Sequence, residues 1–286
     1  MKIIRNIYAI IFLLFLYACS GPRYYTYSPV PVPTPFFTEK NNSTIDVQAT
    51  SSLEFESGHK DKSIGVKVNA AYALTNHFAI TTSFDKVYQL DNYSRSWNDG
   101  VQNFDSNSIA YNKHLWEIGI GYFTRLGDSK TFFNIYGGIG IGKDKIKEKG
   151  WLAESELPEN YINNDVRKFW LQPALHFISK KHVSFGIGTR LVLLQHNNVQ
   201  SSYTQAQISK RQLQELGSRN YFYVEPHFNT KITVYPKWLS VNIGLGFCPS
   251  VTTDDDGLVE DDSRQRNRYV IGSLGLSFDL HKIGKK

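Results

Sequence analysis

The stretch "SIGVKVNAAYAL", from Ser63 to Leu74, decides the fold of this chain of 286 residues. Apolar side chains occupy every second position from Ile64 to Leu74, and small or polar residues such as Lys67 lie between them. Successive side chains of a β-strand point to opposite faces of a sheet. The alternation therefore predicts a strand with one apolar and one polar face.

The same alternation recurs along most of the chain, and it gives ten predicted strands in total. They cover residues 43–56, 63–74, 77–85, 115–123, 132–143, 169–177, 183–193, 221–234, 239–247 and 269–280. Short turns are expected near residue 76 and at 126–130, 179–182 and 235–238, and long polar loops at 91–108, 147–164, 197–218 and 252–267. Short turns at one end and long loops at the other are typical of a transmembrane β-barrel, whose short turns face the periplasm.

A soluble barrel with an apolar lining and a polar exterior, as in a lipocalin, is the alternative. Many glycines lie on the polar face, where they would suit a narrow lumen but have no purpose on a solvated surface. Several strands also exceed the ~9–11 residues that cross a bilayer. The sequence thus favours an all-β, antiparallel, up-and-down transmembrane barrel over residues 43–282, of about ten strands, with eight as the alternative. Aromatic girdles at the membrane interfaces are expected from Tyr72, Tyr88, Trp116, Tyr122, Trp238 and Phe278.

The first 18 residues read as a secretory signal. Two basic residues precede the apolar run "IYAIIFLLFLYA", which is shorter than the ~20 residues of a transmembrane helix. The following "LYAC" resembles the lipobox of bacterial lipoproteins, in which the cysteine carries acyl chains, although Tyr17 departs from the usual small residue. We expect lipidation with palmitate-like chains at Cys19; cleavage after Ala18 without a lipid is the alternative.

A proline- and tyrosine-rich tether follows over residues 19–42. Its alternate prolines favour an extended polyproline-like chain of ~3.1 Å per residue. That is longer than an anchor needs, and its aromatic residues suggest that it docks in the lumen or against the periplasmic rim.

The charge and the cysteine content argue against a nucleic-acid partner and against a disulfide. The formal charge is +6, and loss of Lys2 and Arg5 with the signal leaves a mild +4 of scattered basic residues. We therefore expect no nucleic-acid partner. If Cys19 carries lipid, Cys248 has no partner for a disulfide.

Charged residues on the polar faces would meet inside the barrel. The residues expected to form this polar network are Lys67, Asp85, Glu117, Arg190, Glu225, His227, Lys231 and Asp279. A network of ion pairs is favoured over an active site or a solute path, because a barrel of about ten strands leaves little free lumen.

Enzymatic and metal sites find little support. Asp85, Asp91 and Asp105 are the acidic candidates for an outer-membrane protease, but the Asp279–His281 pair lies at the opposite end of the barrel. The acidic run 253–262 lacks the spacing of an EF-hand. We expect no catalytic residues, no metal and no cofactor. Residues 205–218 suggest a short helix or ordered turn in an external loop, without an apolar stripe.

The lipobox, the segment "PTPFFTEKNNSTIDV", the stretch "AYALTNHFAI" and a glycine-rich hairpin together resemble a family of lipid-anchored outer-membrane β-barrel proteins from Bacteroidetes. The resemblance implies an outer-membrane barrel without assigned catalytic residues. The absence of an acidic residue after Cys19 favours an anchor in the periplasmic leaflet. We expect a non-enzymatic barrel in contact with outer-membrane lipid, with a structural role or an envelope protein as partner. A small-solute channel and, less favoured, an outer-membrane hydrolase are the alternatives.

Overall fold

The computed structural model describes most of the chain beyond the signal and the first part of the tether. The described residues are 34–53, 62–98, 102–127, 130–152, 155–156, 158–180, 182–205, 208, 213–214, 216–234, 238–248 and 269–283. The expected signal, Cys19 and the acidic run 253–262 lie outside them.

Eleven strands make up the fold, and ten of them close into one barrel. They are β1 (Ser43–Leu53), β2 (Lys62–Ala73), β3 (Phe78–Asn98), β4 (Gln102–Arg125), β5 (Thr131–Leu152), β6 (Ser155–Glu156), β7 (Asn160–Lys180), β8 (Val183–Ser201), β9 (Asn220–Thr233), β10 (Leu239–Cys248) and β11 (Tyr269–Asp279). A short 3₁₀ helix, Leu280–Lys282, follows the last strand.

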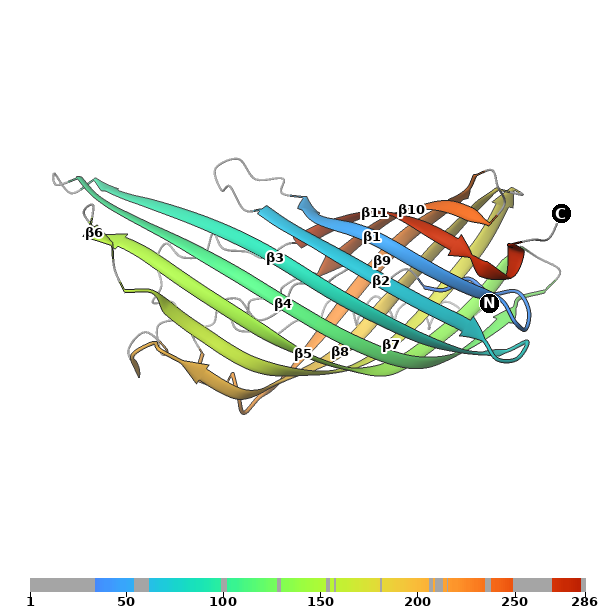
Figure 1. Cartoon of the computed structure of the whole chain (residues 1–286), viewed down its shortest axis with the longest axis horizontal. Coiled ribbons are helices and arrows are strands. Elements are labelled where there is room, and N and C mark those ends of the chain that lie inside the picture. The colour runs from blue at the N-terminus through green and yellow to red at the C-terminus, as the bar shows by residue number, and fades with distance from the viewer. Residues whose placement is uncertain are drawn as a thin grey trace, which may run out of the picture.

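Every strand of the barrel pairs antiparallel with its neighbours, and β1 pairs with β11 to close the ring (Figure 1). The two-residue β6 only extends the hairpin that begins with β5, so β5 pairs next with β7. The prediction of a ten-stranded antiparallel barrel is therefore confirmed. Closure pairs both edges of the strands in the lower barrel, which removes a site of aggregation there, whereas the described part of β3 beyond Leu90 pairs with β4 alone.

The strands differ greatly in length, and the long ones project from one wall of the barrel (Figure 1). β4 has 24 residues and β5 has 22, whereas β1 and β11 have 11 each. At ~3.3 Å per residue β4 is about 80 Å long, far more than an apolar band ~25 Å tall requires even with tilt. We call the end with the short connections the turn rim and the opposite end the projecting rim.

Two of the expected long loops are largely strand, and a third begins as strand. β3 and β4 pair up to Asn98 and Gln102, so residues 91–108 form a hairpin rather than a loop. Residues 147–152, 160–164 and 197–201 likewise belong to β5, β7 and β8. The prediction was wrong here because the polar composition of these segments reads as loop. Where their side chains are described, as at residues 147–150, exposed lysines alternate with buried residues as in a strand.

The lower part of the barrel, toward the turn rim, carries an apolar belt. Ile64, Ile118, Ile120, Ile141 and Leu274 are each at least 60% exposed, while the polar residues between such positions point inward and are buried. This inside-out arrangement agrees with the predicted orientation of the two faces. A surface so rich in exposed aliphatic side chains is suited to lipid rather than to water.

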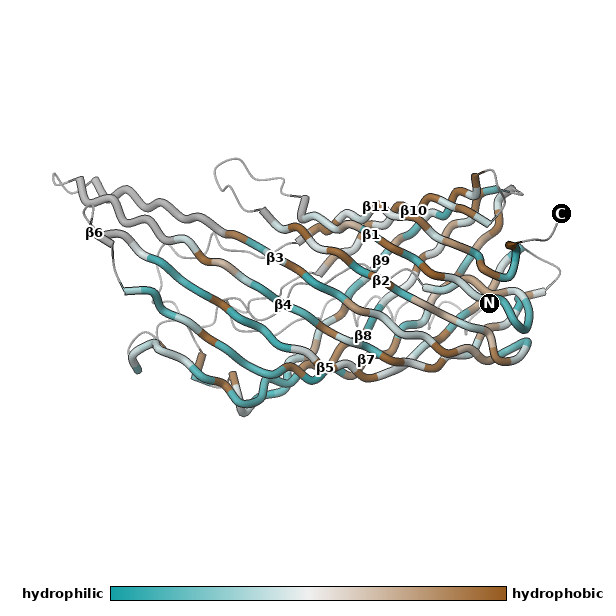
Figure 2. Tube along the Cα trace, viewed as in Figure 1, coloured by the Kyte–Doolittle hydropathy of each residue, from teal (hydrophilic) through white to brown (hydrophobic). Residues whose placement is uncertain are grey.

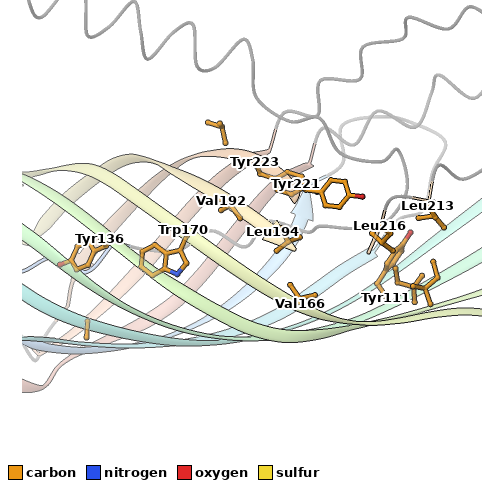
Figure 3. Packing of buried hydrophobic residues seen from close by; sticks show 14 of the residues in the cluster. Tyr111, Tyr136, Val166, Trp170, Val192, Leu194, Leu213, Leu216, Tyr221 and Tyr223 are labelled. Carbon is orange, nitrogen blue, oxygen red and sulfur yellow. The ribbon is translucent and has the colours of Figure 1, made fainter. Parts of the chain in front are cut away.

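Toward the projecting rim the two faces exchange their character. The outward positions become hydrophilic, and Figure 2 colours most of the projecting part of β5 hydrophilic; many of the inward positions become apolar, although Asp144 and Glu148 are also buried there. The buried cluster there includes Tyr111, Ile146, Ile162, Val166, Val192, Leu194, Tyr221 and Tyr223 (Figure 3). This part of the barrel thus has the core of a water-soluble protein.

The connection between β8 and β9 turns inward over this core. Leu213 and Leu216 are buried in the cluster together with Tyr203, whose hydroxyl donates a hydrogen bond to Glu148 (Figure 3). The expectation of an external segment without an apolar stripe was therefore wrong for these two leucines, which are buried. In the described part of the chain, no helix is both long and apolar enough to span a membrane.

Candidate functional site

The middle of the lumen holds a cluster of ion pairs around Glu117. The Arg190 guanidinium lies 2.7 Å from one carboxylate oxygen of Glu117, and the Lys168 ammonium lies 3.1 Å from the other. The Ser83 hydroxyl also donates to this carboxylate, at 3.0 Å. All four side chains come from different strands, so the cluster ties β3, β4, β7 and β8 together across the lumen.

A second pair completes this layer. Lys67 is fully buried and lies 3.1 Å from the Asp85 carboxylate on the neighbouring strand. Glu225 stands directly across from Arg190 in the register of β8 and β9. Three cations, Lys67, Lys168 and Arg190, therefore face three carboxylates, and buried charges that balance in this way avoid the large cost of an unpaired ion.

Arg190 also contacts the aromatic ring of Trp170, at the edge of this layer of ion pairs. Its guanidinium carbon lies 4.3 Å from the centroid of the Trp170 ring, a cation–π arrangement (Figure 3 shows Trp170). Trp170 in turn lies against Gly119, where an added Cβ would come within 2.6 Å of the ring. A side chain at position 119 would displace the ring, which explains why a glycine stands there on the lumen face.

His227 belongs to a separate hydrogen-bonded group just below. The Gln172 amide donates to the Thr34 hydroxyl at 2.9 Å and to His227 Nε2 at 3.2 Å. Since Nε2 then accepts, Nδ1 carries the proton and donates to the backbone carbonyl of Glu225 at 3.4 Å. The Glu225 carboxylate thus does not orient this ring, so the two residues do not form a base with its orienting acid.

The remaining predicted lumen residues lie at the turn rim. The Lys231 ammonium is 2.6 Å from one oxygen of Asp279, and the Lys282 ammonium is 2.8 Å from the other. His281, two residues beyond Asp279, contacts the backbone of Ser43 outside this group. The structure therefore turns all eight predicted network residues inward but divides them between a middle layer and the rim.

The end of the proline-rich tether occupies the lumen between these two groups. Thr34 and Phe37 are almost fully buried. Phe36 packs its ring against Phe132 and His176, with centroids 5.1 and 5.4 Å away. The two spaces flanking Pro35 measure only about 20 Å³ each, room for roughly a single water.

This segment runs from the interior down to the turn rim. On β7, Phe36 contacts His176, whereas Thr34 contacts Gln172, four residues farther from the turn rim. On β5, the Asn134 amide donates to the Pro35 carbonyl, which again lies deeper than the Phe36 contact with Phe132. The chain thus enters β1 from inside the barrel, and residues 34–37 close its lower half.

Several residues of the site were not singled out from the sequence. Lys168, Trp170, Gln172 and His176 all point inward from β7. Their common signal is the alternation of β7, which continues without a break from Asn164 to His176. The apolar upper core was missed because its outward neighbours are charged, which hid the strands themselves.

The described residues offer no site for metal chemistry. They contain no group of three or more His, Cys, Asp or Glu side chains placed to hold an ion. Asp85 is committed to Lys67, while Asp91 and Asp105 fall in strands whose side chains at these positions are not among those described. The geometry therefore supports packing, ion pairing and closure of the lumen.

The chain was compared with curated proteins and with solved structures. No curated protein matches the chain. Among solved structures, an outer-membrane channel from Pseudomonas putida F1 is 10% identical, with a TM-score of 0.42, covering 86% of this chain and 99% of that chain. The translocator domain of the autotransporter NalP from Neisseria meningitidis is also 10% identical, with a TM-score of 0.47 and coverages of 85% and 89%. Likeness this distant says nothing of what this chain does.

The family comparison is decisive. The profile of the family described as "Outer membrane protein beta-barrel domain" matches residues 37–222, more than half of the chain. The match begins at Phe37, inside the lumen segment, and extends into β9. The chain belongs to this family and is an outer-membrane β-barrel protein.

Proposed function

We propose that the protein is a non-enzymatic outer-membrane barrel with a closed lumen, which serves the envelope structurally or as a docking partner for another envelope protein. The observation that carries the proposal is closure at three levels. Residues 34–37 fill the lower lumen, the Glu117 cluster fills the middle, and the apolar core with Leu213 and Leu216 fills the top. Each level is packed from several strands, as expected of a stable wall rather than a path for solutes.

A lipid anchor at Cys19 is part of the same proposal. The sequence "LYAC" supports it, and the absence of an acidic residue after the cysteine favours the periplasmic leaflet. Two or three acyl chains would attach the N-terminus stably. Metabolic labelling with a palmitate analogue is expected to mark the wild-type protein and to be lost in Cys19→Ala; labelling that persists in this variant would contradict the anchor.

The second candidate is a small-solute channel, and one observation favours it. Residues 34–37 are not part of the barrel wall, and side chains hold them through ring contacts and a few hydrogen bonds, such as Gln172 to Thr34. A segment held in this way can leave the lumen without breaking a strand pair. The closed-barrel proposal differs because the two upper layers would remain in place.

Single-channel recording in planar bilayers separates the two candidates. We expect no stable open current from the purified wild-type protein. We also expect none from a variant in which residues 34–37 are replaced by Gly-Ser-Gly-Ser, because the Glu117 cluster and the upper core still close the lumen. A stable current from the wild type would contradict the closed barrel, and a current that arises only in the variant would favour a channel closed by the tether.

An outer-membrane hydrolase is the least favoured function. Glu225 and His227 lie two residues apart on the same face of β9, and His227 contacts the backbone carbonyl of Glu225 rather than its carboxylate. Both are buried, Glu225 in the layer of the Glu117 cluster and His227 just below it. A hydrolytic activity that disappears in His227→Ala, while the barrel still folds, would overturn the non-enzymatic proposal.

A further inference from the structure

A row of four lysines runs along the outside of β5. In "KDKIKEK", residues 143–149, Lys143, Lys145, Lys147 and Lys149 are exposed, while the residues between them are buried. Because the side chains of a strand alternate, the four ammonium groups share one face at intervals of about 7 Å. The row lies on the projecting part of the barrel wall, where Figure 2 shows β5 as hydrophilic.

Neighbouring strands widen this row into a basic patch. His114 on β4 stands across from Lys143, and Lys86 on β3 stands across from His114. Arg167 on β7 is exposed one rung closer to the apolar belt, across from Ile141. Two carboxylates lie beside the lysines, Asp165 at 3.9 Å from Lys143 and Glu159 at 2.6 Å from Lys147. We define the basic patch as Lys86, Lys143, Lys145, Lys147, Lys149 and Arg167; these six cations outnumber the two carboxylates.

The position of the basic patch along the barrel indicates which layer of the membrane it meets. On β5, Ile139 and Ile141 are more than half exposed, and Lys143 is the next outward residue. On β4, Trp116 lies level with Ile141 and is 56% exposed, and His114 is the next residue on that face toward the projecting rim. Tryptophan favours the interface between hydrocarbon and head groups. The patch therefore begins where the apolar belt ends, at the head groups of the outer leaflet, because the turn rim faces the periplasm.

The patch also contains a hollow that could hold a head group. A depression of about 530 Å³ lies between β5, β7 and β8 and is lined by Lys143, Lys145, Asn163, Asp165 and Asn198. The pairing of β7 and β8 is irregular here, between Asn163 and Asp165. Its volume falls within the ~300–1,000 Å³ of small-ligand sites. The ammonium groups of Lys143 and Lys145 and the amide of Asn163 are donors suited to phosphate oxygens. The carboxylates of Asp144 and Asp165 line the hollow too, and the Asn198 amide donates to Asp165 at 2.6 Å.

From this placement we infer that the basic patch binds the phosphate groups of anionic glycolipids in the outer leaflet of the outer membrane. A phosphate-bearing lipid would place its anions at the depth of the head groups, and a basic cluster at a membrane surface gains affinity for anionic lipid with each cation. The inference requires only the outer-membrane location, so it stands whether or not the lumen conducts.

A binding titration tests the inference. Purified full-length protein in uncharged detergent micelles is titrated with bisphosphorylated lipid A and, separately, with the same lipid lacking both phosphates. Each basic side chain near a charged surface contributes roughly fivefold in affinity. The double variant Lys143→Gln/Lys145→Gln is therefore expected to bind the bisphosphorylated lipid about 30-fold more weakly than the wild type. Wild-type binding should also weaken as salt is added.

A matched variant controls for net charge. Lys40 precedes β1 and Lys130 precedes β5, so both are exposed at the turn rim, at the other end of the barrel from the patch. The double variant Lys40→Gln/Lys130→Gln removes the same charge and should bind as the wild type does. Heat-modifiable migration on gels confirms that each variant is folded. Equal binding of the lipid without phosphates, equal loss in both double variants, or salt-independent binding by the wild type would each overturn the inference. Binding of a soluble acidic polysaccharide in place of lipid A would overturn it too.

Discussion

The lower and upper parts of the barrel use the same strands with opposite polarity. On β5, Ile139 and Ile141 point outward beside inward glycines, whereas a few residues farther Lys145 and Lys147 point outward around the buried Ile146. The alternation continues without a break while the side that is apolar changes. A strand pattern thus shows that two faces exist, and the surroundings, lipid or water, decide which face is apolar.

The interior differs accordingly. In the belt region a central carboxylate, Glu117, is held by two cations, and in the upper part Tyr111 and Leu194 pack in an apolar core. The first interior depends on charge balance, and the second on apolar burial. Substitutions that act on only one of these terms can therefore break or sharpen the comparison.

The largest effect is expected from Glu117→Gln. This change leaves Arg190 and Lys168 buried without their carboxylate, and breaking a buried ion pair costs about 3–5 kcal/mol. We expect the free energy of unfolding in urea, followed by tryptophan fluorescence in micelles, to fall by this amount. The double variant Glu117→Gln/Arg190→Gln should recover part of the loss, because it also removes an unpaired cation. A double variant as unstable as the sum of both single changes would contradict the charge-balance account.

Next is Leu194→Ala in the upper core. Leu194 is 1% exposed, and truncating a buried leucine costs about 2–5 kcal/mol. Its outward neighbour Gln195 provides the control, because Gln195→Ala should change the free energy of unfolding by no more than about 0.5 kcal/mol. Urea unfolding of both variants measures the difference. If both changes had equal effects, the upper part would lack the soluble-type core that we describe.

A comparable effect is expected on the outside, from Ile118→Arg. Ile118 is 62% exposed in the belt, and an arginine on the lipid face costs about 2–4 kcal/mol near the bilayer midplane. Asn112 is the matched control, since it is exposed on the same face of the same strand above the belt. Unfolding in lipid vesicles should show a clear loss for Ile118→Arg and none for Asn112→Arg. Equal tolerance of both would place the belt elsewhere.

The strands of the lower barrel could be predicted from the sequence for a physical reason. A strand between lipid and a narrow lumen must alternate bulky apolar residues with glycine or polar ones, as Ile118, Gly119 and Ile120 do. Closure of such strands was expected because an open sheet would leave unpaired edges. The inward direction of Lys67 and Glu117 followed from the same alternation.

The partners within each ion pair and the strands of the upper barrel could not be predicted in this way. That Glu117 meets Arg190 depends on how strands 73 residues apart face each other across the lumen, which local alternation does not encode. In the upper barrel both faces contain polar residues, as Asp144 and Glu148 point inward beside Ile146. The contrast between faces is weak there, and so the strands read as loops.

The smallest effect is expected at the exposed pair of Glu159 and Lys147. The Lys147 ammonium, 2.6 Å from the carboxylate, lowers the pKa of Glu159 below its ordinary value of 4.5. A lowered folded-state pKa means that the pair adds stability above that ordinary value and loses it as the pH falls through the folded pKa. Because water screens an exposed pair, Glu159→Gln should leave the urea midpoint unchanged at pH 7. Carboxyl-carbon NMR should show Glu159 titrating below pH 4.5 in the wild type and closer to it in Lys147→Gln. A stability loss like that of Glu117→Gln would show that the outer surface, too, depends on paired charges.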